Sequence, residues 1–399
     1  MILRTLFLAV VLLAGSCSSP QAASHRRPNI LVVVSDDQSW NSASWFKTPA
    51  FDRVAREGAL FTHAFATSPG CSPSRASMLT GRYPWQIEEA GTHASSFPTR
   101  YVTYPDLLER SGYAVGMTGK GWGPGDWKVS GRTRNPAGTE FQDRKFVPPY
   151  RSISDNDYAA NFADFLQKRG KRQPFCFWFG SNEPHRDYKN DVGLEDGAGR
   201  KAGKKLADAG VPPFLPDTPE VRSDLLDIAV ETEWFDLQLG RMIQLLEEAG
   251  ELDNTLIIVT SDNGTSFPCA KANLYESGIR VPLAIRWPAR IPAGRRVKEL
   301  TSLIDLTPTI LEAAGVARPE TDPMAGKSLL GAGGAPRRPV ISGRERHTSA
   351  RKDNLGYPSR AIRTADYLHI RNLKPDRWPM GDPRCFDGKG ELLPMHSGY

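Results

Sequence analysis

The chain has 399 residues, of which 39% are hydrophobic and 24% charged, with 36 glycines and 32 prolines. This is ordinary globular composition, and it excludes a mainly disordered, collagenous or membrane-bundle chain. Lys and Arg number 51 against 45 Asp and Glu, a net charge of +6. That mild excess suits an acidic substrate and is too weak to indicate a nucleic-acid partner. The five cysteines include no Cys-x-x-Cys pair and make no disulfide framework.

The first 25 residues are typical of an export signal. Arg4 supplies a positive charge, and residues 6–13 form an apolar run that is too short to span a bilayer. The small residues before Cys17 are similar to a bacterial lipoprotein box, in which Cys17 is the lipid anchor. The alternative is ordinary cleavage near Ala22 or Ala23. We therefore expect an exported protein of the bacterial cell envelope, periplasmic or anchored as a lipoprotein.

Apolar runs alternate with amphipathic stretches along the remaining chain, which predicts an α/β fold with a central, mostly parallel sheet flanked by helices. The stretch 186–216 is rich in Gly, Lys, Asp and Pro, and is expected to be a long surface excursion. In chain order we expect a strand from residue 29, a helix over 51–57, a strand over 59–66, helices over 73–79 and 105–110, a strand over 113–118, a helix over 156–168, a strand over 174–180, one bent helix or two helices over 219–250, strands over 256–260 and 281–287, a helix over 305–314 and a strand-like segment over 362–372.

Three of the expected strands end in polar residues. Asp36 and Asp37 follow the first strand, residues 182–185 (Asn-Glu-Pro-His) follow another, and Asp262 and Asn263 follow a third. Each group alone is typical of a cap or a turn. Together they lie where open α/β sheets place ligand sites, beyond the carboxyl ends of strands. Three carboxylates and an amide oxygen favour Ca²⁺ or Mg²⁺ over zinc.

The segment from Gly70 to Pro84 carries a cysteine at an expected helix start. Cys71 would lie near free backbone N–H groups and the positive end of the helix dipole. Arg75 follows one helical turn later and can face the same point. A buried, inert cysteine beside an ordinary helix start is the alternative that the spacing alone leaves open.

The run Cys71-Ser-Pro-Ser-Arg75, continued by Leu79-Thr-Gly-Arg82, resembles the signature of the type I sulfatase family. The Pro-Asn-Ile that precedes Asp36-Asp37 and the later Ser261-Asp-Asn-Gly264 are similar to that family in the same order, so the resemblance covers roughly residues 28–380. It implies an alkaline-phosphatase-like sandwich fold. It also implies that a maturation enzyme oxidises Cys71 to formylglycine, whose hydrate is the nucleophile.

The resemblance assigns the other site residues. It implies one Ca²⁺ bound by Asp36, Asp37, Asp262, Asn263 and an oxygen of the converted Cys71. Arg75 matches the residue that stabilises the nucleophile, Lys120 and Lys271 match lysines that hold sulfate oxygens, and His185 matches a histidine near the leaving group. This chemistry is coherent, because the cations face oxygens that gain charge and His185 can donate a proton.

Two departures from the family pattern stand out. Most sulfatases carry a histidine two or three residues after the position of Lys120, whereas here Trp122 lies in that stretch. The general base is therefore open, and Trp122 is expected either to shape the substrate pocket or to pack in the core. The second departure is the ending at Tyr399, without the usual end of the C-terminal subdomain. We expect a catalytic domain over 26–345 and the start of a small, incomplete subdomain over 346–399.

Within the family, the segments 261–282 and 362–379 look most like N-sulfoglucosamine sulfohydrolases, which implies a sulfated saccharide substrate of the heparan type. An O-sulfatase acting on another sulfated glycan or an aryl sulfate is the alternative, and a non-catalytic glycan-binding protein is a second. A two-metal phosphatase is disfavoured because no histidine follows Asn263 until His347. Candidates for sugar contact, or else for a solvated charged loop, are Arg371, Lys374, Asp376 and Arg377.

Overall fold

The computed structural model describes residues 26–41, 46–150, 152–185, 191–194, 203–318, 323–331, 338–347 and 355–377. The predicted signal segment with Cys17 and the chain ending at Tyr399 lie outside the described residues. Within the described ranges, no helix combines the length and the apolar character that crossing a membrane requires.

The centre of the molecule is an eight-stranded sheet with the order β10-β2-β9-β7-β1-β6-β4-β5. All neighbouring pairs are parallel except the two that β9 makes, so β9 alone runs against the others. The strands β1 and β7 are buried along their whole length, as their continuous Ile/Leu/Val runs predict. The bounds are β1 Asn29–Ser35, β2 Ala59–Phe61, β4 Ala114–Gly119, β5 Thr139–Glu140, β6 Phe175–Gly180, β7 Thr255–Ser261, β9 Leu283–Arg286 and β10 Arg295–Val297.

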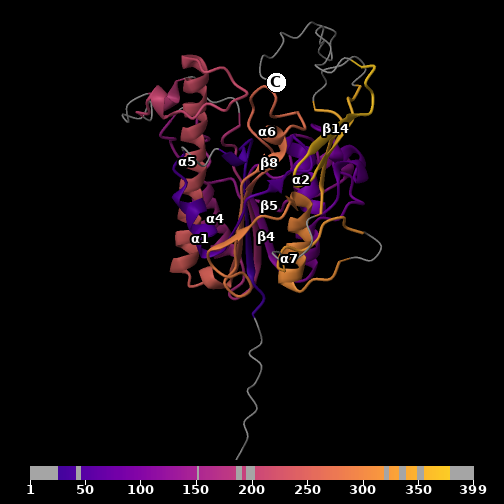
Figure 1. Ribbon diagram of the computed structural model, residues 1–399. Coiled ribbons are helices and arrows are strands. Elements are labelled where there is room, and N and C mark those ends of the chain that lie inside the picture. Colours follow the sequence, from indigo (N-terminus) through magenta and orange to yellow (C-terminus); the bar gives the residue numbers. More distant parts are fainter. Residues whose placement is uncertain are drawn as a thin grey trace, which may run out of the picture.

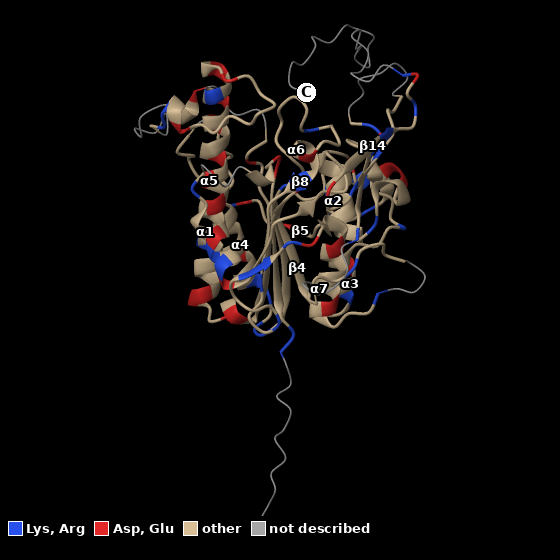
Figure 2. Cartoon of the chain, in the orientation of Figure 1, with Lys and Arg blue, Asp and Glu red and all other residues tan. Residues whose placement is uncertain are grey.

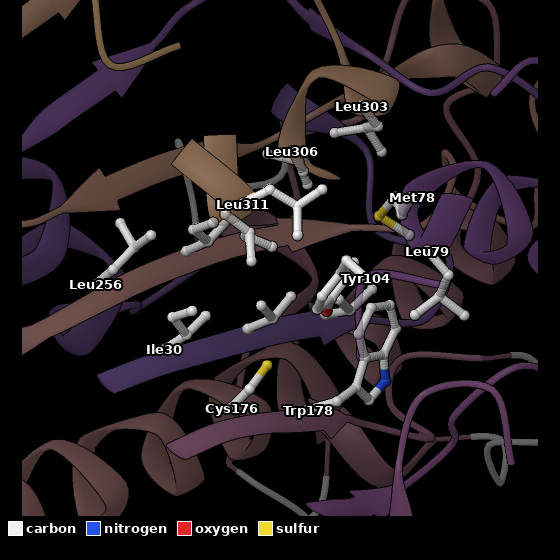
Figure 3. Close-up of a cluster of buried hydrophobic side chains, with 14 of the residues drawn as sticks. Ile30, Met78, Leu79, Tyr104, Cys176, Trp178, Leu256, Leu303, Leu306 and Leu311 are labelled. Carbon is white, nitrogen blue, oxygen red and sulfur yellow. The ribbon is translucent and has the colours of Figure 1, made fainter. Parts of the chain in front are cut away.

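Helices cover both faces of this sheet (Figure 1). One face packs against α1 Pro49–Glu57, α4 Tyr158–Lys168 and α5 Pro219–Glu248, and the other against α2 Cys71–Thr80, α3 Tyr104–Arg110 and α7 Leu306–Ala314. Figure 3 shows the core between the sheet and α2, α3 and α7, where strand residues such as Ile30 and Leu256 share one cluster with Leu79 of α2 and Leu311 of α7. Each buried side chain of this size contributes about 1.5–3 kcal/mol. The predicted α/β class with a mostly parallel central sheet is confirmed.

Two three-stranded sheets stand beside the main one. The first has the order β11-β3-β8, and the second is antiparallel with the order β12-β13-β14. The second docks beside the segment that leads into α2, because the backbone N–H of Gly343 donates to the carbonyl of Thr67 (2.7 Å) and the hydroxyl of Ser342 to that of Ala66 (2.7 Å). The remaining elements are β3 Ala64–Phe65, β8 Arg280–Val281, β11 Thr301–Ser302, β12 Val340–Arg344, β13 Ser359–Arg363, β14 Leu368–Asn372, α6 Glu276–Ile279 and the 3₁₀ turns Pro84–Gln86, Glu88–Gly91, Lys128–Ser130, Val192–Leu194, Leu206–Asp208, Leu252–Asn254 and Leu303–Asp305.

Several expected elements differ in detail. The single strands expected over 59–66 and 281–287 are each divided between the main sheet and the β11-β3-β8 sheet. The stretch expected as two helices or one bent helix is one helix of 30 residues, α5. Phe235, Leu239 and Met242 hold the helix on the core around Gly240, and this packing outweighs the roughly 1 kcal/mol helix penalty of glycine. The segment expected over 362–372 is the hairpin β13–β14.

Candidate active site

The carboxyl ends of β1 and β7 bring four oxygen-bearing side chains together. Because these strands are parallel neighbours in register, with Ser35 opposite Ser261, the residues that follow them lie side by side. Asp36, Asp37, Asp262 and Asn263 are all at most 1% exposed. One oxygen from each of the three carboxylates lies within 4.8 Å of the others. The predicted oxygen cluster is thus assembled in the structure.

Two oxygens of this cluster indicate room for a cation. Oδ1 of Asp36 and Oδ1 of Asn263 are buried and accept no hydrogen bond from the described residues, although Asp36 Oδ1 lies 3.6 Å from Nη2 of Arg75. Buried acceptors are otherwise almost always satisfied. A hard divalent cation such as Ca²⁺ takes carboxylate and amide oxygens of this kind. The side chains therefore fit the metal that the sequence predicted.

Cys71 is the first residue of α2 and is fully buried. Its Sγ lies 3.9 Å from Oδ1 of Asp37, at the helix end where backbone N–H groups are free. Burial, reinforced by the negative charge of Asp36, raises the pKa of the thiol far above neutrality. An unmodified Cys71 would thus stay a thiol at neutral pH and would be a poor nucleophile.

Arg75 joins the start of α2 to the carboxylates. Its Nε donates to Oδ2 of Asp262 at 2.7 Å, and its Nη1 donates to the carbonyls of Lys120 (2.6 Å) and Gly121 (3.1 Å). The guanidinium is fully buried. Although burial opposes ionisation of Asp36, the charges of Lys120 and Arg75 hold the pKa of that carboxyl below its usual range. Arg75 therefore favours the charged form of Asp36 and fixes the loop after β4.

Three further groups predicted from the sequence meet at the same point. Nζ of Lys120 lies 2.5 Å from Oδ2 of Asp36, and Nζ of Lys271 lies 2.6 Å from Oδ2 of Asp37. Nζ of Lys271 is also 3.0 Å from Nε2 of His185. Despite burial, the charge of Asp37 holds the pKa of Lys271 well above its ordinary value. Both lysines are therefore cationic at neutral pH.

The formal charges of this cluster balance when all of its acidic and basic groups are ionised. Three carboxylates face three cations, Arg75, Lys120 and Lys271. A bound divalent cation would make the cluster positive, and the group that restores neutrality is an anion. Charges fixed in a buried site act on such a group more strongly than they would in water. The arrangement thus suits a reaction in which an anionic group gains negative charge.

An open cavity of about 430 Å³ adjoins the cluster, with Asp36, Lys120, Glu183 and His185 in its wall. Glu183 supports the loop that carries His185. It accepts hydrogen bonds from the Tyr158 hydroxyl (2.9 Å) and the Ser154 backbone N–H (2.9 Å), and its carbonyl accepts from the N–H of Asp36 (3.0 Å). His185 keeps 32% of its side chain exposed, so it can contact a molecule in the cavity.

Two predicted substrate contacts lie elsewhere. Trp122 is 2% exposed and packs edge-on against Phe97, with 5.3 Å between ring centroids, so its role is packing rather than pocket lining. The side-chain oxygen of Asn135 accepts from its backbone N–H at 2.9 Å, which holds the turn. Arg371 is exposed on β14, in a hairpin where basic residues gather (Figure 2). The described contacts do not link Arg371 to the carboxylate cluster.

Sequence reasoning missed two histidines near Cys71. His93 and His347 stack with ring centroids 4.4 Å apart. A Cβ added to Gly70 would lie 3.1 Å from Nδ1 of His347, so this ring lies against the residue that precedes Cys71. The only available signal was the short list of seven histidines, because neither residue belongs to a recognisable motif.

The buried carboxylates and the cations around them could hold a divalent metal beside an anionic group. A model of the Sulfatase family matches residues 28–316. N-sulphoglucosamine sulphohydrolase of Homo sapiens is 31% identical, with 92% of this chain and 76% of the relative aligned. The chain therefore belongs to the sulfatase family, and it is a hydrolase of sulfuric ester or sulfamate bonds.

Two other similarities, to a second sulfatase and to a solved structure of the same fold, leave the substrate open. N-acetylglucosamine-6-O-sulfatase of Bacteroides thetaiotaomicron is 26% identical, covering 79% of this chain and 73% of that protein. The solved phosphonate monoester hydrolase of Agrobacterium radiobacter superposes with a TM-score of 0.63 at 19% identity, covering 87% of each chain. The second likeness shows the fold alone. The substrate must therefore be argued from the site.

Proposed function

We propose that this protein removes the sulfate group from N-sulfoglucosamine, as found in heparan-type glycans, using formylglycine made from Cys71 and one Ca²⁺. The observation that carries the proposal is the assembly of Cys71, Lys120, His185 and Lys271 around the carboxylate cluster. The similarity to a human N-sulphoglucosamine sulphohydrolase over 92% of the chain supports the choice of sugar.

The residues divide the chemistry between them. Asp36, Asp37, Asp262 and Asn263 would hold the cation, which supplies positive charge beside the sulfate oxygens when bound. Formylglycine would supply a hydrated aldehyde as the nucleophile at residue 71. Lys120 and Lys271 stabilise the charge that grows on the sulfate oxygens.

His185 provides the proton that the leaving group needs. A sulfamate nitrogen leaves poorly as an anion and must be protonated as the S–N bond breaks. The imidazole of His185 lies in the cavity wall and beside Lys271, so its Nε2 faces the place where a sulfate group would be held. Proton donation there would contribute on the order of 10²–10⁴-fold to the rate.

The first test separates the nucleophile from the fold. Cys71→Ser should abolish sulfate release while leaving the melting temperature close to that of the wild type, because the aldehyde cannot form by oxidation of a thiol that is absent. The peptide around Cys71 should show the corresponding mass loss in the wild type. Undiminished turnover by Cys71→Ser would refute the formylglycine mechanism here.

The second test separates the two leaving groups. His185→Ala should lose far more activity on N-sulfoglucosamine than on an activated aryl sulfate, whose phenolate leaves without a proton. His369→Ala, a change of the same kind on the exposed strand β14, should leave both activities intact. Equal losses on the two substrates would favour the alternative O-sulfatase, which the similarity to a 6-O-sulfatase supports.

The amino-terminal sequence supports a proposal about where the reaction takes place. We propose that the chain is exported and that Cys17 carries a lipid, which would keep the enzyme in the cell envelope with its glycan substrates. The apolar run of residues 6–13 and the small residues before Cys17 support this. Labelling with a radioactive fatty acid that is lost in Cys17→Ala would verify the anchor, and an unlabelled wild type would refute it.

A further inference from the structure

The wall of the open cavity contains residues of two kinds. Asp36, Lys120 and His185 belong to the cluster that would hold the cation and the sulfate group. The neutral residues of the wall are Ser152, Ile153, Ser154 and Asn182. The cavity of about 430 Å³ is of the size that small-molecule sites have, and a sulfate group alone fills only a small part of it. The remainder of a ligand would therefore lie against the neutral residues.

Asn182 is a neutral residue that a ligand in this cavity can reach. Its side chain is exposed and lies in the cavity wall. Within the described part of the chain, its side-chain amide makes no hydrogen bond. An amide offers two N–H donors and an acceptor oxygen. It is thus matched to a hydroxyl group, which donates and accepts, whereas a sulfate group only accepts.

The backbone fixes the position of Asn182 relative to His185. The N–H of His185 donates to the carbonyl of Asn182 at 3.1 Å, and the Cα atoms that such a turn joins lie within about 7 Å of each other. The N–H of Asn182 donates to the hydroxyl oxygen of Tyr158 at 3.2 Å, and that hydroxyl donates to the carboxylate of Glu183 at 2.9 Å. The amide is therefore held near the imidazole that would serve the leaving group.

A second chain segment meets the loop of Asn182 in the same wall. The backbone N–H of Ser154 donates to the carboxylate of Glu183 at 2.9 Å, which joins residues 152–154 to residues 182–185. Oγ of Ser152 is buried and has no hydrogen-bond partner among the described residues. Because buried polar groups are almost always satisfied, an unsatisfied hydroxyl in a cavity wall is an independent sign of a polar ligand.

We infer that Asn182 is a specificity-determining residue, whose side-chain amide hydrogen-bonds a ring hydroxyl of the sulfated sugar near the sulfamate. This inference rests on the proposed function, because it presumes a sugar in the cavity. Lys120 and Lys271 then recognise the charge of the sulfate group, and Asn182 recognises the sugar that carries it. A site that hydrogen-bonds a hydroxyl group discriminates against a ligand that lacks it.

Binding of two sulfamates to protein with unconverted Cys71, in buffer that contains Ca²⁺, tests the inference without turnover. N-sulfoglucosamine and cyclohexylsulfamate both carry a sulfamate on a six-membered ring, but only the first has hydroxyl groups. In calorimetry, Asn182→Ala should weaken binding of N-sulfoglucosamine about five- to tenfold, the loss of one good hydrogen bond. Its binding of cyclohexylsulfamate should change less than about twofold, because that ligand has no hydroxyl group to lose.

Two further variants complete the test. Asn182→Asp places a negative charge near the sulfamate and should weaken binding of both ligands. Asn254→Ala is the matched control, because Asn254 directly precedes β7 and so lies at the amino end of that strand, away from the site at its carboxyl end. This control should bind both ligands like the wild type. Asn182→Ala should keep the wild-type melting temperature, since its amide holds no other part of the described chain.

The outcomes separate this inference from the proposed function. Unchanged binding of N-sulfoglucosamine by Asn182→Ala overturns the role of Asn182, and so does an equal loss for both ligands. A wild type that binds cyclohexylsulfamate as tightly as N-sulfoglucosamine, or an Asn182→Asp variant that binds both like the wild type, overturns it as well. A wild type that binds the sugar through Asn182, but releases no sulfate from it when fully matured, refutes the proposed function and leaves the role of Asn182 intact.

Discussion

Replacing Arg75 by methionine should destabilise the protein far more than loss of a surface arginine would. Arg75 is fully buried, bonds Asp262 at 2.7 Å and donates to two carbonyls. Its removal leaves buried carboxylates without this counter-charge, which typically costs about 3–5 kcal/mol. An unfolding entropy of about 2.1 cal/mol/K per residue over the 317 described residues converts this to a fall of about 5–8 °C in melting temperature.

The assay is thermal unfolding of Arg75→Met followed by circular dichroism, in the same buffer as the wild type. Arg290→Met is the matched control, because Arg290 forms an exposed ion pair with Glu312 at 3.4 Å and such pairs contribute about 0–1 kcal/mol. Adding Asp262→Asn to Arg75→Met removes one uncompensated charge and should recover part of the loss. The reasoning fails if Arg75→Met melts within 1 °C or so of the control, or if the double variant is less stable than Arg75→Met.

Four further changes probe other parts of the structure. Chelating Ca²⁺ should lower the wild-type melting temperature, since a ligand present at 100 times its Kd stabilises the folded state by about 2.7 kcal/mol. In a calcium titration, Asp262→Asn should lose most of the rise in melting temperature that the wild type shows. Burial raises the pKa of Asp236 to about 6 from 3.8. Because the folded-state pKa is higher than the unfolded one, the free energy of unfolding should fall as pH rises from about 4 to about 6. Asp236→Asn should reduce this pH dependence in urea unfolding curves measured at several pH values. Gly70→Ala puts a methyl group 3.1 Å from Nδ1 of His347 and directly before Cys71, so it should slow sulfate release; the melting temperature should stay near wild type, because φ at Gly70 is an extended −157°. Trp122→Ala should cost about 3–5 kcal/mol of unfolding free energy, whereas a drop in sugar affinity without loss of stability would return Trp122 to the substrate pocket.

The carboxylate cluster at the edge of the sheet could be predicted because it depends largely on local signals. Continuous apolar runs such as those of β1 and β7 form buried parallel strands, and the residues after them must then gather at one edge. Asp36 and Asp262 lie side by side because β1 and β7 are also parallel neighbours in the sheet. The helix that begins at Cys71 and ends at Gly81, with φ of 68°, likewise follows from the local sequence.

Features that depend on the pairing partner could not be predicted. Pro282 lacks a backbone N–H, and the chain changes sheets there, so β8 pairs with β3 while β9 runs antiparallel to β7. No sequence signal within residues 281–287 indicates which strands pair with them. The stacking of His93 on His347 is of the same kind, because it requires β12 to dock beside Ala66 and Thr67.

The burial of Cys71 imposes an order of events on the life of the chain. Its side chain has no accessible surface, and the whole of α2 around it is enclosed. An enzyme that modified this thiol could not reach it in the folded chain, so it would have to act before α2 is enclosed. If activity depends on converting Cys71, as proposed, modification and folding would compete in time, and a chain that folded first would stay inactive. Slower folding would raise the fraction of chains that are modified and active. The specific activity of a preparation would then depend on how fast its chains folded during synthesis rather than on the stability of the folded protein.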